Sequence, residues 1–514
     1  MNRKSILYAA TFLAAALPAA AMAQTTVAPQ TIHITIDGKA TTTPFPHAWE
    51  QMFGSGRAVL SLRDSYRTDL RTVRDATGFR YVRFHGIFHD EIGFFDLDKA
   101  GKPVYNFSYI DQIYDGLLEN HVKPFVELSF TPKALASDPA ALHAFWYKQN
   151  VSPPKDYALW DDMIHQFTQH LVDRYGIDEV ASWYFEVWNE PNIDFWVGTP
   201  KQPTYFELYD HTARAIKKVN ARLRVGGPST AQAAWTTDFL NHCKQGGVPV
   251  DFVSSHVYAN DTAKDVFKTD ENIPRDKMVC RSVRKIHDEI AQSAYPGMPF
   301  ILSEYNASYA NEPNVTDSTY MGPWMATTIA QCDGLSTMMS YWSFSDVFEE
   351  QGIVKTPFYG GFGLVAADNI PKPALNVFAA LHRLGDARLA ESSDSALVTR
   401  RKDGTIVIAL WNYAAPDGTG PDYTRPLPAG AVKHFELSVA PGVVRHASVI
   451  RVDDTHGNVV KTYDAIGRPA APSREQITQL RNAGKASPAE SIVMKEGKLT
   501  IDVPTHGLAV VELH

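Results

Sequence analysis

The chain has 514 residues, of which 44% are hydrophobic, 11% aromatic and 21% charged, and its formal net charge at pH 7 is −8. This length is enough for a large core and for more than one domain. An acidic chain of ordinary globular composition argues against nucleic acid or an anionic membrane surface as a partner.

The first 23 residues have the pattern of a secretory signal peptide. Arg3 and Lys4 form a charged start, residues 6–17 form an apolar core too short to span a bilayer, and Ala21-Met-Ala23 fits a small-residue cleavage site. We therefore expect export to the periplasm or the medium, with a mature chain beginning at Gln24. Removing the two positive charges of Arg3 and Lys4 changes the formal charge from −8 to −10.

Residues 45–385 alternate short apolar strands with amphipathic helices. This alternation predicts an α/β fold with a parallel sheet, and eight such units favour a (β/α)8 TIM barrel over an open doubly wound sheet. The expected strands are Trp49–Phe53, Tyr81–Gly86, Pro124–Ser129, Trp183–Asn189, Arg224–Gly227, Phe252–Tyr258, Pro299–Glu304 and Met338–Ser343. Helices are expected at Ser108–Asn120, Leu159–Tyr175 and Tyr205–Leu223.

The pattern changes near residue 386, where short strand-like segments are separated by Gly, Pro and Asp turns. We expect an accessory all-β sandwich over residues 386–514, to which residues 24–44 add an N-terminal strand at Thr31–Ile36, and a short surface helix at Ser473–Asn482. No linker rich in Ser, Pro or Thr precedes this unit, which favours a structural role over a separate carbohydrate-binding module. The expected strands are Ala396–Arg400, Thr405–Trp411, His434–Val439, Ala447–Val452 and Leu499–Val503.

The three cysteines, Cys243, Cys280 and Cys332, are an odd number, so at least one thiol is unpaired within a monomer. Their wide spacing excludes a disulfide scaffold and gives no metal signature. This pattern favours three buried thiols.

Two glutamates stand at the expected carboxyl ends of barrel strands, where TIM-barrel enzymes hold their working residues. Glu190 ends the fourth strand and Glu304 ends the seventh, across the mouth of the barrel. Two carboxylates that flank one bond are what glycoside hydrolysis requires. Asn189 can bind the sugar hydroxyl next to the anomeric carbon, which favours Glu190 as acid/base and Glu304 as nucleophile. Tyr258 is a plausible hydrogen-bond donor to an ionised Glu304.

Several stretches together resemble glycoside hydrolase family 39, which contains β-xylosidases and α-L-iduronidases. The Asn-Glu-Pro triplet alone is shared by many barrel hydrolases, whereas the combination with the later motifs is specific. The stretches are Tyr81-Val-Arg-Phe-His-Gly86, Phe185-Glu-Val-Trp-Asn-Glu-Pro-Asn192, Ser255-His-Val-Tyr258, Leu302-Ser-Glu-Tyr-Asn306, Tyr341-Trp-Ser-Phe-Ser-Asp-Val-Phe-Glu-Glu350, Phe358-Tyr-Gly-Gly-Phe-Gly-Leu364 and Gly467-Arg-Pro469.

The resemblance implies a retaining glycoside hydrolase with Glu190 as acid/base and Glu304 as nucleophile. It implies no metal and no organic cofactor, and the expected partner is an oligosaccharide or glycoside substrate. The residues expected to line the subsite for the non-reducing sugar are Asn189, His85, His256, Tyr258, Trp342, Glu349 and Glu350.

The leading interpretation is an exo-acting β-xylosidase that releases xylose from xylo-oligosaccharides. The same mechanism on another sugar stays open: a β-glucosidase, an arabinopyranosidase or a uronidase. A uronidase needs Arg or Lys for the sugar carboxylate, and Lys201 and Lys355 keep that alternative open. A non-catalytic carbohydrate-binding protein is disfavoured because both glutamates are present. Trp49 and Trp196 are equally compatible with an outer subsite and with packing.

Overall fold

A computed structural model describes residues 30–390, 393–415, 430–439 and 446–514 of the chain. The predicted signal peptide lies outside the described residues. Within these ranges, no helix combines the length and the apolar character needed to cross a membrane.

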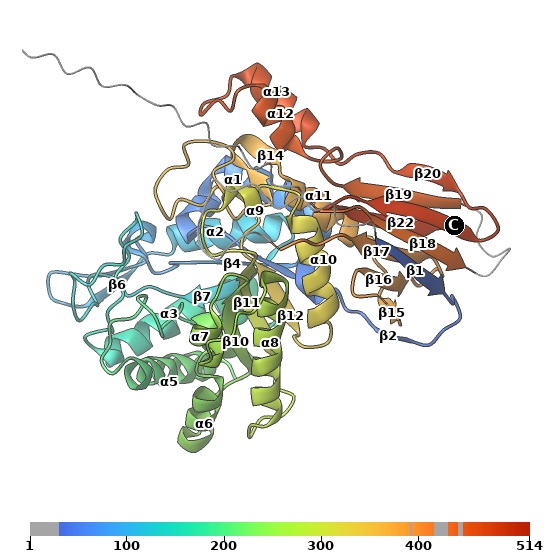
Figure 1. Cartoon of the computed structure of the whole chain (residues 1–514). Coiled ribbons are helices and arrows are strands. Elements are labelled where there is room, and N and C mark those ends of the chain that lie inside the picture. The colour runs from blue at the N-terminus through green and yellow to red at the C-terminus, as the bar shows by residue number, and fades with distance from the viewer. Residues whose placement is uncertain (1–29, 391–392, 416–429, 440–445) are drawn as a thin grey trace, which may run out of the picture.

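Eight parallel strands form a closed barrel at the centre of the molecule, with helices around it (Figure 1). The strands follow one another in chain order around the barrel, and each is followed by a crossover that contains helix, so the predicted fold class is confirmed. The strands are β3 (Met52–Gly54), β4 (Tyr81–Phe84), β7 (Lys123–Leu128), β8 (Tyr184–Val187), β9 (Val225–Thr230), β10 (Phe252–Tyr258), β11 (Phe300–Asn306) and β12 (Met338–Tyr341).

The barrel helices bury apolar stripes against the strands. Helix α3, for example, is capped by Asp156, whose carboxylate accepts from two backbone N–H groups, and it buries Trp160, Phe167 and Leu171 on its inner face. The helices of this part are α1 (Asp64–Thr77), α2 (Ser108–Glu119), α3 (Tyr157–Tyr175), α4 (Ile177–Val180), α5 (Lys201–Val219), α6 (Thr236–Gly246), α7 (Ala263–Phe267), α8 (Arg275–Ala291), α9 (Pro313–Thr316), α10 (Met321–Cys332) and α11 (Pro373–Leu381).

The first barrel strand starts later than the predicted Trp49–Phe53. Residues Ala48–Glu50 form a 3-10 turn, and β3 begins only at Met52. Trp49 and Glu50 are nevertheless buried in this turn. The apolar character of this segment therefore reflects packing against the core and not a strand.

The accessory unit packs two sheets face to face, as predicted, and stands beside the barrel (Figure 1). Its three-stranded sheet contains β1 (Gln30–Ile36), which pairs in parallel with β18 (Lys433–Val439), and β21 (Lys498–Val503). The seven-stranded sheet contains, in spatial order, β2 (Thr42–Pro44), β15 (Ala387–Leu389), β16 (Ala396–Arg400), β17 (Ile406–Trp411), β22 (Leu508–Leu513), β19 (His446–Val452) and β20 (Glu490–Val493).

A common apolar core joins the two sheets of the accessory unit. Ile34, Phe435 and Ile501 from the smaller sheet meet Ile408 and Val511 from the larger one. The predicted surface helix is α13 (Arg474–Ala483), whose start carries a capping box formed by Ser473 and Gln476. It follows α12 (Val459–Ala465), and both helices contribute to an apolar cluster with barrel residues. This packing crosses the predicted boundary at residue 386, so the domain limits at 45–385 and 386–514 stay a prediction.

Chain entry to and exit from the barrel lie side by side. Strand β2, just before the barrel, pairs with β15, just after it, through Thr43 and Arg388. The N–H of Phe45 also donates to the carbonyl of Asp386 at 2.8 Å. The accessory unit therefore holds the two ends of the barrel segment together.

The expectation of three buried thiols was wrong for two of them. Cys280 on α8 and Cys332 on α10 form a disulfide across a separation of 52 residues, and Cys243 is a buried free thiol. The reason is tertiary: α8 and α10 pack against each other, and spacing in the chain does not reveal that contact.

Candidate active site

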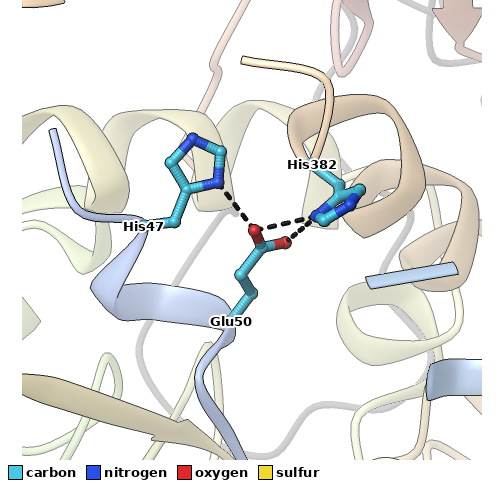
Figure 2. A group of neighbouring side chains, drawn as sticks. All are labelled: His47, Glu50 and His382. Carbon is cyan, nitrogen blue, oxygen red and sulfur yellow. Dashed lines mark hydrogen bonds and ion pairs between the residues drawn. The ribbon is translucent and has the colours of Figure 1, made fainter. Parts of the chain in front are cut away.

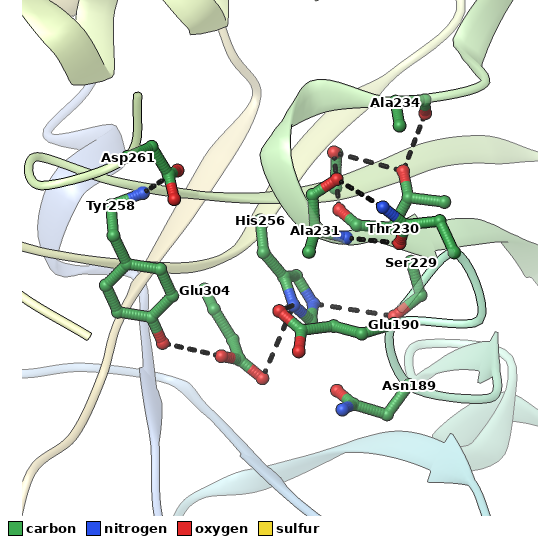
Figure 3. Close-up of polar contacts among 12 residues, drawn as sticks. Asn189, Glu190, Ser229, Thr230, Ala231, Ala234, His256, Tyr258, Asp261 and Glu304 are labelled. Carbon is green, nitrogen blue, oxygen red and sulfur yellow. Dashed lines mark hydrogen bonds and ion pairs between the residues drawn. The ribbon is translucent and has the colours of Figure 1, made fainter. Parts of the chain in front are cut away.

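Glu190 and Glu304 meet at the carboxyl end of the barrel. Glu190 lies just beyond β8, in a turn where its φ is 45° and its N–H donates to Ser229 at 2.8 Å. Glu304 lies within β11. One carboxylate oxygen of each residue and a ring nitrogen of His256 all lie within 4.8 Å of one another. Both side chains therefore reach one common point, as Figure 3 shows.

Glu304 accepts hydrogen bonds from two strong donors. The hydroxyl of Tyr258 donates to Oε2 at 2.6 Å, the contact expected from the sequence, and Nη1 of Arg83 donates to Oε1 at 2.6 Å. Burial raises the pKa of Glu304 from its usual value, and the charges of Arg83 and His85 and the Tyr258 hydrogen bond offset only part of that rise. These two donors favour the ionised form of Glu304.

The pKa of Glu190 is raised more strongly than that of Glu304. Burial raises its pKa well above the usual value, and the negative charge of Glu304 raises it further. Its Oε1 lies 3.0 Å from Nδ1 of His256. Burial, with the nearby positive charges of Arg83 and His85, lowers the pKa of His256 well below its usual value, so this imidazole is neutral. The site therefore holds a proton on Glu190 and a charge on Glu304.

A buried charge network lies directly beneath the two glutamates. The guanidinium of Arg83 contacts Glu186 at 2.6 Å, Glu127 at 2.8 Å and the amide oxygen of Asn189 at 2.9 Å, in addition to Glu304. This contact fixes the orientation of the Asn189 amide, so its nitrogen is the end that can donate to a ligand.

His85 extends the network toward the cavity. Its Nδ1 lies 2.7 Å from Glu127, and its Nε2 lies 3.9 Å from Glu304 and 3.8 Å from Glu350. Burial opposes a charge on His85, but the carboxylate of Glu127 outweighs burial and raises the pKa. A cationic His85 would place a second positive charge near Glu304.

A cavity of about 280 Å³ opens above these carboxylates. Its size and mixed polar and aromatic walls suit a small ligand with apolar faces. The indole of Trp342 forms part of one wall and packs on Gly54, where a Cβ atom would lie 2.0 Å from the ring. The cavity is lined by His85, Phe145, Asn189, Glu190, Ile193, Phe195, Ala231, Gln232, Tyr258, Asp261, Glu304, Tyr309, Trp342, Glu350, Gln351 and Phe362.

Seven of the nine predicted site residues line this cavity, and two lie elsewhere. The seven are His85, Asn189, Glu190, Tyr258, Glu304, Trp342 and Glu350. His256 is fully buried, and its Nδ1 contacts the carboxylate of Glu190 at 3.0 Å. The carboxylate of Glu349 is bound by Arg63 at 2.5 Å and 3.1 Å and by Arg57 at 3.2 Å, away from the cavity lining. The pattern Glu349-Glu350 therefore divides into one structural and one cavity-facing residue.

Glu350 faces the cavity with a perturbed ionisation. Burial raises its pKa to about 8, and the charges of Glu304 and Glu127 contribute while His85 opposes them. At neutral pH this side chain is mostly a carboxylic acid, which can donate one hydrogen bond and accept others.

The residues considered for outer subsites and for uronate binding do not line the cavity. Trp49 and Trp196 are buried in the fold. Lys201 donates to the carbonyl of Ile193 at 2.5 Å, and Lys355 lines a separate depression. None of the described residues that line the cavity is Lys or Arg.

Glu190, His256 and Glu304 are close enough for a metal ion to bind between them. The chemistry of the surroundings disfavours it, because Nη1 of Arg83 already contacts the same oxygen of Glu304 at 2.6 Å. A metal cation would be repelled by this buried guanidinium, whereas a proton on Glu190 is tolerated. The donor set fits acid/base chemistry better than metal binding.

Sequence reasoning missed Arg83, Glu127, Glu186 and Asp261. The first three are charged residues inside otherwise apolar barrel strands, and that contrast was a usable signal, since buried charges occur in pairs. Asp261 lies in a loop after β10, where its carboxylate accepts from the N–H of Tyr258 at 2.8 Å and burial raises its pKa to about 7. Nothing in the local sequence distinguishes it.

Comparison with known proteins finds relatives that match most of the chain in sequence and in fold. The model of the Glycosyl hydrolases family 39 matches residues 32–499. A β-xylosidase of Geobacillus stearothermophilus is 39% identical over 452 residues, which is 85% of this chain and 86% of that protein. A β-xylosidase of Caldicellulosiruptor saccharolyticus is 36% identical over 450 residues, 85% of this chain and 88% of that protein. The crystal structure of a monomeric β-xylosidase from Caulobacter crescentus CB15 superposes with a TM-score of 0.84 at 33% identity, covering 94% of this chain and 99% of that one.

Proposed function

The chain belongs to glycosyl hydrolase family 39 and is a glycoside hydrolase, and we propose that it is a retaining, exo-acting β-xylosidase. The observation that carries the retaining mechanism is the spacing of Glu190 and Glu304, one oxygen of each lying within 4.8 Å of the other. Retaining enzymes hold their carboxyl groups about 5–5.5 Å apart, whereas inverting enzymes leave roughly 6.5–9.5 Å for a water.

In the first step, the ionised Glu304 attacks the anomeric carbon while the bond to the aglycone oxygen breaks. Glu190 gives its proton to that oxygen, so the aglycone leaves as a neutral alcohol. Arg83 and Tyr258 support this step by keeping Glu304 charged before attack. The product is a glycosyl ester on Glu304.

In the second step, Glu190 accepts a proton from a water that attacks the same carbon. Formation of the ester removes the charge of Glu304, and that charge is one cause of the high pKa of Glu190. The pKa of Glu190 therefore falls when the ester forms, which turns the acid into a base at the right stage. Glu304 leaves as a carboxylate, and the sugar keeps its configuration.

Two observations support xylose as the sugar. The relatives matched over most of their length are named β-xylosidases. The described cavity lining also lacks Lys and Arg, the residues that bind a sugar carboxylate, which argues against a uronidase. The small volume of the cavity, about 280 Å³, suits removal of single terminal sugars.

The amino-terminal segment supports a proposal of export. Arg3, Lys4, the apolar residues 6–17 and Ala21-Met-Ala23 have the order of charge, apolar core and cleavage site found in signal peptides. Amino-terminal sequencing of the protein recovered from the periplasm and the medium should begin at Gln24.

A panel of aryl glycosides tests the sugar. The β-xyloside should give the highest kcat/KM, compared with the β-glucoside, the α-L-arabinoside and the α-L-iduronide. Proton NMR of the reaction should show the β-anomer of xylose before mutarotation. A faster reaction with another glycoside would correct the sugar, and first appearance of the α-anomer would contradict the retaining mechanism.

A further inference from the structure

A second cluster of ligating side chains lies at the opposite end of the barrel from Glu190 and Glu304. It consists of His47 and Glu50, just before β3, and His382, the residue after α11. One ligand atom from each lies within 4.8 Å of the others. Figure 2 shows the carboxylate of Glu50 between the two imidazole rings.

The distances show that both imidazoles converge on one carboxylate. Nδ1 of His47 lies 2.7 Å from Oε1 of Glu50, and Nδ1 of His382 lies 2.9 Å and 3.0 Å from its two oxygens. The Glu50 carboxylate is buried, and within the described part of the chain these two imidazoles are its ion-pair partners.

The second ring nitrogen of His47 has a backbone partner of its own. Its Nε2 lies 3.3 Å from the carbonyl oxygen of Gly385, which can only accept a hydrogen bond. A proton on Nδ1 satisfies the 2.7 Å contact with Glu50, whereas a proton on Nε2, held by this carbonyl, leaves the lone pair of Nδ1 available to a metal ion.

We propose that His47, Glu50 and His382 form a binding site for Zn²⁺. Two imidazoles and one carboxylate are a common zinc ligand set, and a water would complete the fourth position. A ring N–H held by a backbone carbonyl, as Nε2 of metal-bound His47 would be by Gly385, is the usual support for a metal-bound histidine. Imidazole ligands also favour Zn²⁺ over Mg²⁺ or Ca²⁺, which prefer oxygen.

Zinc binding requires only a small local adjustment. Ligand atoms about 2.0–2.1 Å from a tetrahedral zinc lie about 3.3 Å from one another, slightly more than the nitrogen–oxygen distances of 2.7–3.0 Å in this cluster. The side chain of His382 is 46% exposed, so this ring can move outward.

The position of the site points to a structural role. Glu50 and His47 lie where the chain enters the barrel, and His382 lies where it leaves, next to the pairing of β2 with β15. A bound ion would link the first and last elements of the barrel beside the accessory unit. Because the catalytic carboxylates lie at the other end, zinc should stabilise the fold without entering the reaction.

Isothermal titration of untagged, chelator-treated protein with ZnCl₂ tests the proposal. We expect one equivalent of Zn²⁺ to bind and the thermal midpoint to rise, with no response to MgCl₂ or CaCl₂. His382→Gln should weaken this binding by about tenfold or more and remove the thermal shift. Co²⁺ should show the absorption of a tetrahedral site in the parent protein and lose it in His382→Gln.

His434→Gln is the matched control, because His434 forms a single imidazole–carboxylate pair with Asp502 at 2.6 Å on the accessory unit. This variant should bind Zn²⁺ like the parent. Binding of less than one equivalent, or equal affinity in His382→Gln and His434→Gln, would show that the cluster is a hydrogen-bond network and overturn the proposal. Since His382 is half exposed, its variant should fold, and circular dichroism checks this.

Discussion

Nη1 of Arg83 lies 2.6 Å from Oε1 of Glu304, and the same guanidinium reaches Glu127, Glu186 and Asn189. Arg83 thus connects the proposed nucleophile to the buried layer beneath it. The fork of donors fixes several acceptors at once, which a lysine ammonium cannot reproduce.

Arg83→Lys should therefore lower both activity and stability. Each lost charge-assisted hydrogen bond costs about 1.5–3 kcal/mol, and a displaced Glu304 should lower kcat/KM by about 100-fold or more. Arg275→Lys is the control, because Arg275 binds Glu312 at 2.6 Å and 3.0 Å in a buried pair away from the cavity. Aryl xyloside kinetics and thermal melts should show a stability loss in both variants and an activity loss in Arg83→Lys alone. An equal activity loss in both would contradict a specific role for Arg83.

Tyr258→Phe tests the other donor to Glu304. The Tyr258 hydrogen bond lowers the pKa of Glu304, so its removal should raise that pKa and shift the acid limb of the kcat/KM profile to higher pH. We expect kcat to fall by about 10- to 100-fold. Tyr305→Phe, the adjacent position, whose hydroxyl binds the carbonyl of Trp49, should keep the parent profile. An unshifted acid limb in Tyr258→Phe would count against this role.

Glu190→Ala tests which of the two glutamates is the acid/base and which is the nucleophile. Loss of the proton donor should lower kcat by about 10²- to 10⁴-fold for a poor leaving group and much less for a dinitrophenyl xyloside. Azide should restore turnover of activated substrates and give the β-xylosyl azide, because attack occurs on the ester at Glu304. Recovery of the α-azide by NMR would reverse the assignment of the two glutamates.

The alkaline limb of the pH profile should also report Glu190. Burial and the charge of Glu304 raise its pKa, and the first step needs its proton, so activity falls as pH rises through that pKa. In Glu190→Ala with azide and a dinitrophenyl xyloside, this fall should disappear. Persistence of the same limb would assign it to another group, such as Glu350.

The barrel and the two glutamates could be predicted from the sequence because both follow local rules. Strand and helix periodicity is visible in short windows, and Glu190 follows β8 while Glu304 lies near the carboxyl end of β11. The buried network could not be read in this way, because the partners of Arg83 come from β7, β8 and β11. The Cys280–Cys332 bond and the cluster of Glu50 with His382 likewise depend on helix positions that only the closed fold defines.

Glu350→Gln tests the protonation state of the cavity-facing carboxyl. Because its pKa is raised to about 8, Glu350 is mostly neutral at pH 6, and a neutral amide of the same shape should keep kcat/KM within about threefold. Glu350→Ala should lose considerably more, since its hydrogen bonds to sugar disappear. Aryl xyloside kinetics at pH 6 compare the two variants. Equal losses of kcat/KM in Glu350→Gln and Glu350→Ala would show that a charged carboxylate is required, which would contradict the neutral form of Glu350.

Lys372 supports the wall of the cavity through a buried ion cluster. Its ammonium lies 2.5 Å from Asp317 and 3.2 Å from Asp346, and these carboxylates bind the N–H groups of Gly360 and Gly363. A Cβ atom at Gly363 would lie 2.4 Å from the backbone of Asp346, so the loop approaches the cluster closely. The Tyr-Gly-Gly-Phe-Gly motif therefore has a structural basis.

Lys372→Met should destabilise the protein by about 3–5 kcal/mol, because it leaves two buried carboxylates without a cation. Burial raises the pKa of Asp317 to about 6 even beside Lys372, so at pH 5 this carboxyl is mostly protonated in the folded state. A carboxyl group whose pKa is raised in the folded state stabilises the fold at low pH. This contribution to stability is lost as the pH rises through that pKa. The stability loss in Lys372→Met should thus be larger at pH 8 than at pH 5.

Lys402→Met is the control, because Lys402 is 90% exposed and contacts Asp386 at 3.4 Å. The thermal midpoint of this variant should stay near that of the parent at both pH values. An equal loss at pH 5 and pH 8 would contradict this assignment of charge.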